Sequence, residues 1–246
     1  MAELNIDLHP AQLQIFHSDK RFKIVAAGRR FGKSYLSAWI LLIKAIQSES
    51  KDVFYIAPTF QQAKDIMWAM LKDLGRDLIV QAYENTAVLT LINGRKIYLK
   101  GSDRPETLRG VGLAYVVLDE YASMKPQVWE QIIRPTLADV RGGALFIGTP
   151  AGKNHFFDLY KDALDDDDWD AFQYTSRDNP FLPADEIEAS KKSMSSMSFR
   201  QEFEASFEIS SGGIFKEEWF QVAEEPEEGN YVIAVDPAGY EAVEQE

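Results

Sequence analysis

AGRRFGKS, residues 27–34, is the segment from which the fold can be inferred. It follows the apolar run Phe22–Ala27, which has the composition of a buried strand, and it opens an amphipathic helical pattern over Lys33–Gln47. A glycine-rich loop between a strand and a helix is typical of a phosphate-binding P-loop. Ala27 stands where the usual pattern has its first glycine. The context on both sides still predicts a P-loop.

The residue types of this loop suit a nucleotide and a magnesium ion. Gly32 lets backbone N–H groups approach the phosphates, and the amino end of the following helix adds positive potential. Lys33 is expected to reach the β- and γ-phosphate oxygens, and the Ser34 hydroxyl to bind Mg²⁺. The nucleotide-binding residues predicted in this loop are Gly28, Arg30, Gly32, Lys33 and Ser34.

A second motif ends another apolar run, Tyr115–Asp119, and adds Glu120 directly after it. Asp119 is predicted to hold Mg²⁺ through water. Glu120, one residue past the strand end, is predicted to polarise a water for in-line attack on the γ-phosphate. A water-activating glutamate favours hydrolysis over phosphoryl transfer to a second substrate.

A third apolar run, Ala144–Gly148, leads to Thr149-Pro150. This order places a hydroxyl at the carboxyl edge of the sheet, where open α/β folds bind their ligands. Thr149 is therefore predicted to sense the γ-phosphate, although a plain turn hydroxyl is the alternative.

The wider pattern predicts an α/β fold with a mainly parallel sheet, because short apolar runs alternate with helical patterns. The predicted strands are Phe22–Ala27, Val53–Ala57, Tyr115–Asp119, Ala144–Gly148 and Phe172–Thr175. The predicted helices between them are Lys33–Gln47, Gln61–Leu74 and Gln127–Leu137.

Two further patterns interrupt or follow this rhythm. Val88–Ile92 and Lys96–Leu99 flank Asn93-Gly94, which predicts a β-hairpin with a type I′ turn. Helical patterns over Ala184–Lys192 and Ser198–Ser206 predict a small helical subdomain after the sheet.

Composition and charge limit the class of protein. The 246 residues are 46% hydrophobic and include no cysteine, which fits a globular protein of a reducing compartment. The net charge of -13 is uneven, because residues 1–150 hold 19 Lys/Arg and 15 Asp/Glu while residues 151–246 hold 7 and 24. We expect a polyanion to meet the first part. The sequence predicts neither a signal peptide nor a membrane span.

Together these motifs resemble the ATPase domain of the large terminase subunit of tailed bacteriophages, a P-loop NTPase of the ASCE, RecA-like kind. The likeness rests on the sequence pieces LHPAQ at 8–12, the altered P-loop, the hairpin, LRG at 108–110, LDE at 118–120 and FIGTP at 146–150. The family is a motor that uses ATP and Mg²⁺ to move double-stranded DNA into a procapsid.

The resemblance also implies roles for individual residues. Gln12 would contact adenine, Arg29 would contact phosphate, and Thr149 would belong to the coupling motif. Arg109 lies where some members supply an arginine finger to a neighbouring subunit, so Glu120, Arg109 and Arg29 are the predicted catalytic residues. The implied partners are the portal, the small terminase subunit and further copies in a ring. We expect the isolated chain to be monomeric and the host cytoplasm to be the location.

The predicted domain order is a P-loop ATPase core over 1–175, a helical lid over 176–209 and a linker over 210–230. Residues 231–246 resemble the first strand of the family's RNase H-like nuclease domain, in which Asp236 would hold Mg²⁺ or Mn²⁺. The remaining carboxylates of such a site are missing, so we expect no nuclease activity from this chain.

Two other functions fit some of the same motifs. A DNA or RNA helicase also has an upstream glutamine, a P-loop and an Asp-Glu pair, but it needs a second motor domain. A non-catalytic P-loop interaction module would not need Lys33, Ser34, Asp119 and Glu120 together.

Overall fold

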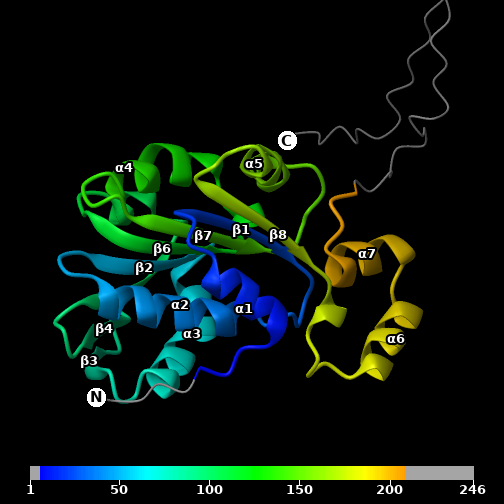
Figure 1. Ribbon diagram of the computed structural model, residues 1–246, viewed down its shortest axis with the longest axis horizontal. Helices are drawn as coiled ribbons and strands as arrows, with labels where there is room; N and C mark the ends of the chain where they lie inside the picture. The colour runs from blue at the N-terminus through cyan, green and yellow to red at the C-terminus, as the bar shows by residue number, and fades with distance from the viewer. Residues whose placement is uncertain (1–5, 209–246) are drawn as a thin grey trace, which may run out of the picture. The chain divides into compact units, whose positions relative to one another are not determined.

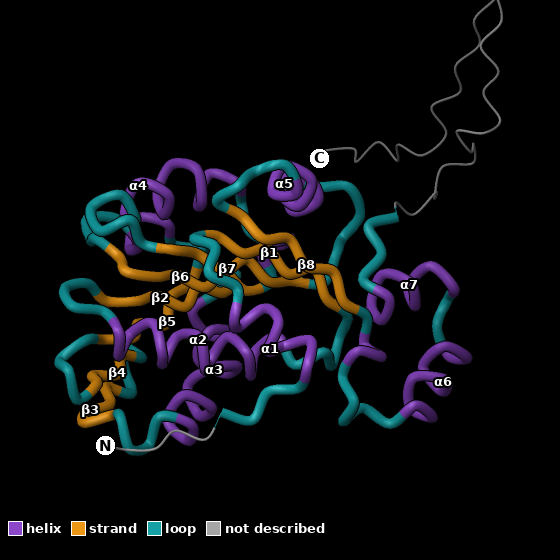
Figure 2. Tube along the Cα trace, in the orientation of Figure 1, coloured by secondary structure: helices purple, strands orange, loops and turns teal. Residues whose placement is uncertain are grey.

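The computed structural model describes residues 6–208. The predicted linker over 210–230 and the predicted strand over 231–246, with Asp236, lie outside the described residues. Eight strands form one sheet in the described part (Figures 1 and 2). They are β1 Phe22–Ala27, β2 Asp52–Ala57, β3 Ile79–Tyr83, β4 Val88–Leu91, β5 Lys96–Gly101, β6 Leu113–Asp119, β7 Gly143–Gly148 and β8 Trp169–Tyr174.

The sheet has the order β3-β4-β5-β2-β6-β7-β1-β8. The six strands from β5 to β8 in this order pair in parallel, and β3 and β4 extend the sheet antiparallel at the β5 edge. The prediction of a mainly parallel α/β sheet is confirmed. Because parallel strands end at the same edge, the carboxyl ends of β1, β6 and β7 meet there.

Helices cover both faces of the sheet, as Figure 1 shows. The helices are α1 Pro10–His17, α2 Lys33–Gln47, α3 Phe60–Leu74, α4 Arg134–Thr136, α5 His155–Leu164, α6 Ala184–Ser193 and α7 Ser196–Glu204. Helices α1, α2 and α3 share one apolar cluster with the sheet, and the segment before α4 and helix α5 share the cluster on the other face. Strand β1 is buried along its whole length, which fits its largely apolar sequence; the exception is Lys23, which is buried as well.

The hairpin is present, but its predicted turn type is wrong. Gly94 has a φ of 80°, whereas Asn93 is not among the residues with positive φ. A type I′ turn needs positive φ at both central positions. The Gly94 N–H donates to the Leu91 carbonyl, as in a three-residue loop that ends with a left-handed glycine. Strand β3, which precedes the hairpin, was not predicted, because four of its five residues are exposed.

The helix predicted over Gln127–Leu137 is only partly regular. A π-helical turn covers Val128–Ile133, and a short α-helix follows at Arg134–Thr136. Pro135 has no backbone N–H and its ring crowds the carbonyl four residues earlier, so a regular α-helix cannot pass through this point.

The two helices of the predicted lid, α6 and α7, are present and lie beside the carboxyl edge of β8 (Figure 1). Their bounds agree with the prediction to within two residues. Helices α1 and α5 had not been predicted. Among residues 6–208, no helix has the length and apolar character that a membrane crossing requires.

Candidate active site

A cavity of about 890 Å³ opens at the carboxyl edge of the sheet. The P-loop residues from Arg29 to Ser34 line it together with Glu120 and Thr149. Glu202, from α7, also lines it. The structure thus brings the P-loop, the glutamate after β6 and the threonine after β7 to one place, as the strand order requires.

The P-loop backbone needs glycine at two positions for different reasons. Gly32 is the N-cap of α2 with a φ of 99°, which disfavours any residue with a Cβ. At Gly28 a Cβ would lie 2.5 Å from the Phe203 carbonyl oxygen and 2.6 Å from the Ser176 hydroxyl. The loop therefore turns tightly at Gly32 and packs closely against the lid at Gly28.

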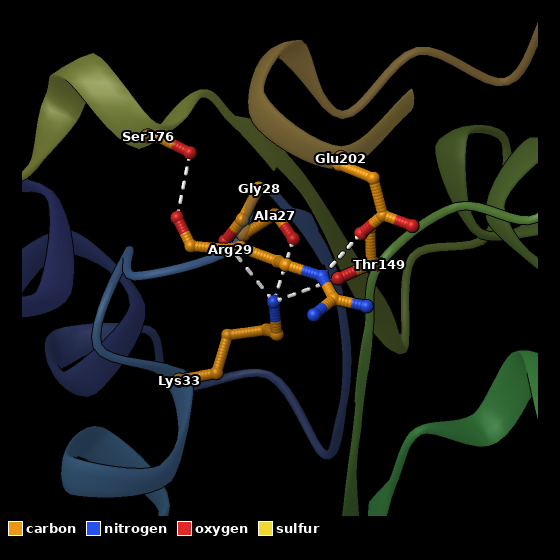
Figure 3. A network of polar contacts seen from close by, with 7 residues as sticks. All are labelled: Ala27, Gly28, Arg29, Lys33, Thr149, Ser176 and Glu202. Carbon is orange, nitrogen blue, oxygen red and sulfur yellow. Dashed lines mark hydrogen bonds and ion pairs between the residues drawn. The ribbon is translucent and has the colours of Figure 1, made fainter. Parts of the chain in front are cut away.

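Lys33 bridges the P-loop and the threonine after β7 (Figure 3). Its ammonium group donates to the carbonyl oxygens of Ala27 at 2.7 Å and Gly28 at 3.1 Å, and to the Thr149 hydroxyl at 3.1 Å. Burial lowers the pKa of Lys33, and the nearby Glu120 and Asp119 carboxylates oppose this shift. The ammonium group thus lies in the cavity wall between the P-loop and the end of β7.

Asp119 is buried at the end of β6 and has two partners. The Tyr55 hydroxyl of β2 donates to one carboxylate oxygen, and the Glu120 N–H donates to the other at 2.9 Å. Burial raises the pKa of Asp119 to about 6, an effect that the hydrogen bond from Tyr55 opposes. A cation bound to this buried carboxylate would favour its charged form and offset the cost of its burial.

This raised pKa predicts how stability depends on pH. A carboxyl group whose pKa is higher in the folded state stabilises the fold below its unfolded pKa, and that contribution is lost as pH rises through about 6. Asp119→Asn stays neutral, so its melting temperature relative to wild type should rise between pH 4 and pH 7. The upper limit is about 3 kcal/mol, at about 1.4 kcal/mol per pKa unit. If the difference in melting temperature between the two proteins stayed constant across this pH range, the raised pKa of Asp119 would be contradicted.

Glu120 follows Asp119 in a left-handed backbone conformation with a φ of 52° and a ψ of 45°. Few residues other than glycine adopt this conformation, and strain of this kind persists where the surrounding structure demands it. The turn ends the strand abruptly and leaves the Glu120 side chain in the wall of the cavity. The carboxylate therefore faces the same space as Lys33.

Arg29 is paired with the lid in this structure. Its guanidinium donates to a Glu202 carboxylate oxygen at 2.5 Å, and its N–H donates to the Glu202 carbonyl at 2.6 Å. The Ser176 hydroxyl donates to the Arg29 carbonyl at 2.6 Å (Figure 3). Arg29 lines the cavity, as predicted, but in this arrangement its charge is neutralised by Glu202.

Four of the described residues predicted for the site do not line the cavity. Gly28 and the buried Asp119 directly precede the lining residues Arg29 and Glu120, whereas Gln12 and Arg109 lie elsewhere. Gln12 is 3% exposed, and its side-chain amide donates to the Gly32 carbonyl oxygen of the P-loop at 2.9 Å. Arg109 is exposed in the connection that leads to β6. Neither residue is part of the cavity that the described residues form.

Sequence reasoning missed four residues that contact the site residues. Tyr55 bonds Asp119, His9 bonds the Phe31 carbonyl, and Ser176 and Glu202 bond Arg29. Each partner is 22 to 173 positions away along the chain. The one sequence signal was a polar residue inside an apolar strand, the tyrosine of β2.

Known proteins are similar to this chain in both sequence and fold. A profile of the family described as "Terminase large subunit, T4likevirus-type, N-terminal" matches residues 24–222. The chain belongs to this family. The terminase large subunit of Escherichia phage T5 is 30% identical over an alignment of 226 residues that covers 87% of this chain and 51% of that protein. This terminase chain therefore spans about half the length of that relative.

Two solved terminase structures have the same fold. The large terminase ATPase domain of Thermus phage P74-26 has a TM-score of 0.71 at 25% identity, over 82% of this chain and 94% of that one. The large terminase of another thermophilic bacteriophage, solved in complex with ADP, has a TM-score of 0.73 at 19% identity, over 82% of this chain and 54% of that one. The resemblance of the sequence to terminase ATPase domains is confirmed.

Proposed function

We propose that this chain binds ATP and Mg²⁺ in the cavity, hydrolyses ATP to ADP and phosphate, and uses the reaction to move double-stranded viral DNA into a procapsid. The observation that carries the proposal is the convergence of Lys33 and Glu120 on one cavity at the end of a parallel sheet. Membership of the terminase large-subunit family and the fold of the P74-26 ATPase domain support it.

The donor atoms present fit magnesium. The Ser34 hydroxyl lines the cavity at the start of α2, and the buried Asp119 carboxylate lies close enough to Lys33 to influence its pKa. Both are oxygen ligands, which Mg²⁺ prefers, and the ion usually keeps several waters. When bound, Mg²⁺ neutralises charge on the β- and γ-phosphates.

The protein groups have separate tasks around the nucleotide. Lys33 leaves the Ala27 and Gly28 carbonyls and pairs with phosphate oxygens, because a charged acceptor is stronger than a neutral one. Glu120 accepts a proton from the attacking water. Thr149 accepts a hydrogen bond from Lys33 in this structure. When ATP is bound, the Thr149 hydroxyl contacts the γ-phosphate instead. The segment after β7 then responds to the presence of that phosphate.

The motor function extends to partners beyond this chain. We propose that double-stranded DNA, the portal and the small terminase subunit act with a ring of copies of this protein in the host cytoplasm. A motor of this kind should hydrolyse ATP faster when linear double-stranded DNA is present. Equal hydrolysis rates with and without DNA in an assembled sample would contradict the proposed DNA translocation. They would be consistent with ATP hydrolysis alone.

Lys33→Ala tests the nucleotide site. Loss of the ammonium group should weaken ATP binding at least about 100-fold, as expected when contacts to a charged group worth about 3 kcal/mol are removed. Turnover should disappear with it. Isothermal titration and a phosphate-release assay measure the two effects. Lys161→Ala, an exposed lysine of α5 on the other face of the sheet, is the matched control. Near-normal hydrolysis by Lys33→Ala would refute the site.

A further inference from the structure

The Tyr55 side chain links strand β2 to the aspartate at the end of β6. Tyr55 is fully buried, and its hydroxyl donates to one oxygen of the Asp119 carboxylate. In the parallel register of the two strands Tyr55 pairs with Val117, so Asp119 lies two residues further toward the carboxyl edge on the same face of the sheet. The phenol ring therefore reaches the end of β6 from within the core.

Packing restricts the movement of this ring. Tyr55 belongs to the apolar cluster that the sheet shares with helices α2 and α3. A ring that is enclosed by close-packed side chains has little freedom to change its position. The Tyr55 hydroxyl is therefore a donor with a fixed place relative to the strand end.

Two donors together orient the Asp119 carboxylate, which is 3% exposed. The Tyr55 hydroxyl donates to one oxygen, and the Glu120 N–H donates to the other at 2.9 Å. The last torsion of an aspartate is only loosely restricted by its own side chain, so a donor on each oxygen is what fixes the carboxylate plane. Each oxygen can accept a second hydrogen bond, which leaves acceptor capacity for a water bound to Mg²⁺.

We propose that Tyr55 is a positioning residue of the magnesium site, which holds the Asp119 carboxylate in place and so sets how tightly the metal is bound with the nucleotide. This inference rests on the proposed function. Loss of a group that orients a metal-binding carboxylate typically lowers metal affinity or activity about 10- to 100-fold. Tyr55 itself does not line the cavity, so its hydroxyl should not affect the nucleotide when the metal is absent.

The test separates the metal from the nucleotide. AMP-PNP, an ATP analogue that resists hydrolysis, is titrated into the full chain by isothermal titration, once with Mg²⁺ and once with EDTA. Tyr55→Phe should weaken binding about 10-fold in Mg²⁺, the low end of the range because Asp119 is expected to reach the metal through water. Its affinity in EDTA should equal that of wild type.

Tyr115→Phe is the matched control. Tyr115 lies in β6, is 3% exposed and belongs to the same apolar cluster as Tyr55. Its hydroxyl has no hydrogen-bond partner within residues 6–208. The same chemical change at a similarly buried tyrosine should therefore leave both affinities at their wild-type values.

A double variant shows whether Tyr55 acts through Asp119. Asp119→Asn alone should weaken binding in Mg²⁺. Adding Tyr55→Phe to this variant should weaken binding little further, because residues that act as one unit have non-additive effects. If the two losses multiplied instead, Tyr55 would act by another route and the inference would be overturned.

Melting temperatures show which variants are folded. Should Tyr55→Phe fail to fold, Tyr55→Met takes its place, because the unbranched methionine side chain adapts to irregular gaps in a core. It also lacks the hydroxyl, so the same loss in Mg²⁺ and the same unchanged affinity in EDTA are expected.

The other outcomes are distinct from one another. Equal losses in Mg²⁺ and EDTA would mean that Tyr55 supports the whole nucleotide site, and unchanged affinities with a lower melting temperature would reduce it to a core contact. Either result would overturn the inference. A wild-type chain that bound AMP-PNP equally well in Mg²⁺ and EDTA would refute the magnesium site and the inference with it, whereas no binding in either would refute the proposed function itself.

Discussion

Glu120→Gln should bind ATP as tightly as wild type and hydrolyse it about 10²- to 10⁴-fold more slowly, the range expected for loss of a general base. The amide has the size of the carboxylate and keeps one acceptor, but it cannot take the proton of the attacking water. We assign this effect to the Glu120 side chain because it lies in the cavity wall, directly after a left-handed turn of the backbone. Single-turnover quench experiments with labelled ATP measure it.

The matched control is Glu130→Gln, an exposed glutamate of the π-helical turn that lies outside the cavity. It should hydrolyse ATP at the wild-type rate. Single-turnover rates for Glu120→Gln equal to those of wild type would mean that another group orients the water.

Arg109→Ala should bind ATP normally and lose about 10³- to 10⁵-fold in hydrolysis once subunits are assembled, as for arginine fingers in other NTPases. Arg109 does not line the cavity of its own subunit in this structure. Arg109 precedes β6 and Glu120 follows it, and a strand of seven residues spans about 20 Å. Arg109 is exposed and outside its own cavity, so it is free to meet the cavity of a neighbouring copy.

A mixture of variants distinguishes action in a neighbour from action within one subunit. Arg109→Ala and Glu120→Gln each lack a different half of a shared site, so mixing them should recover part of the activity. Wild-type specific activity should rise with protein concentration. Arg76→Ala, an exposed arginine after α3 that pairs only with Asp73 among the described residues, serves as the control. Turnover that is independent of concentration and unchanged in Arg109→Ala would make Arg29 the better candidate.

Local sequence was sufficient to predict the parts of the site that follow one another along the chain. The P-loop needs a strand before it and a helix after it, and the Asp119-Glu120 pair needs only the end of β6. These features depend on local periodicity and on single residues with special backbone freedom, such as Gly32. Parallel pairing then follows from the alternation of strands and helices, and it brings all three strand ends to one edge.

Three local features differ from the sequence prediction: the turn at Gly94, strand β3 and the helix before Pro135. The turn at Gly94 has a three-residue form, in which the Leu91 N–H donates to the Arg95 carbonyl and Thr90 pairs with Lys96. Strand β3 was missed because an exposed edge strand has no apolar alternation. The helix predicted over Gln127–Leu137 is irregular for a local reason. Pro135 lacks a backbone N–H and its ring crowds the preceding turn, and a π-helical turn stands before it.

The partners of the site residues depend on tertiary packing. Glu202 stands 173 positions from Arg29, Tyr55 stands 64 positions from Asp119, and Gln12 stands 20 positions from Gly32. No periodicity links residues at such separations, because their contact depends on how whole helices and strands pack. For Gln12, the packing of α1 brings its amide to the Gly32 carbonyl oxygen of the P-loop at 2.9 Å.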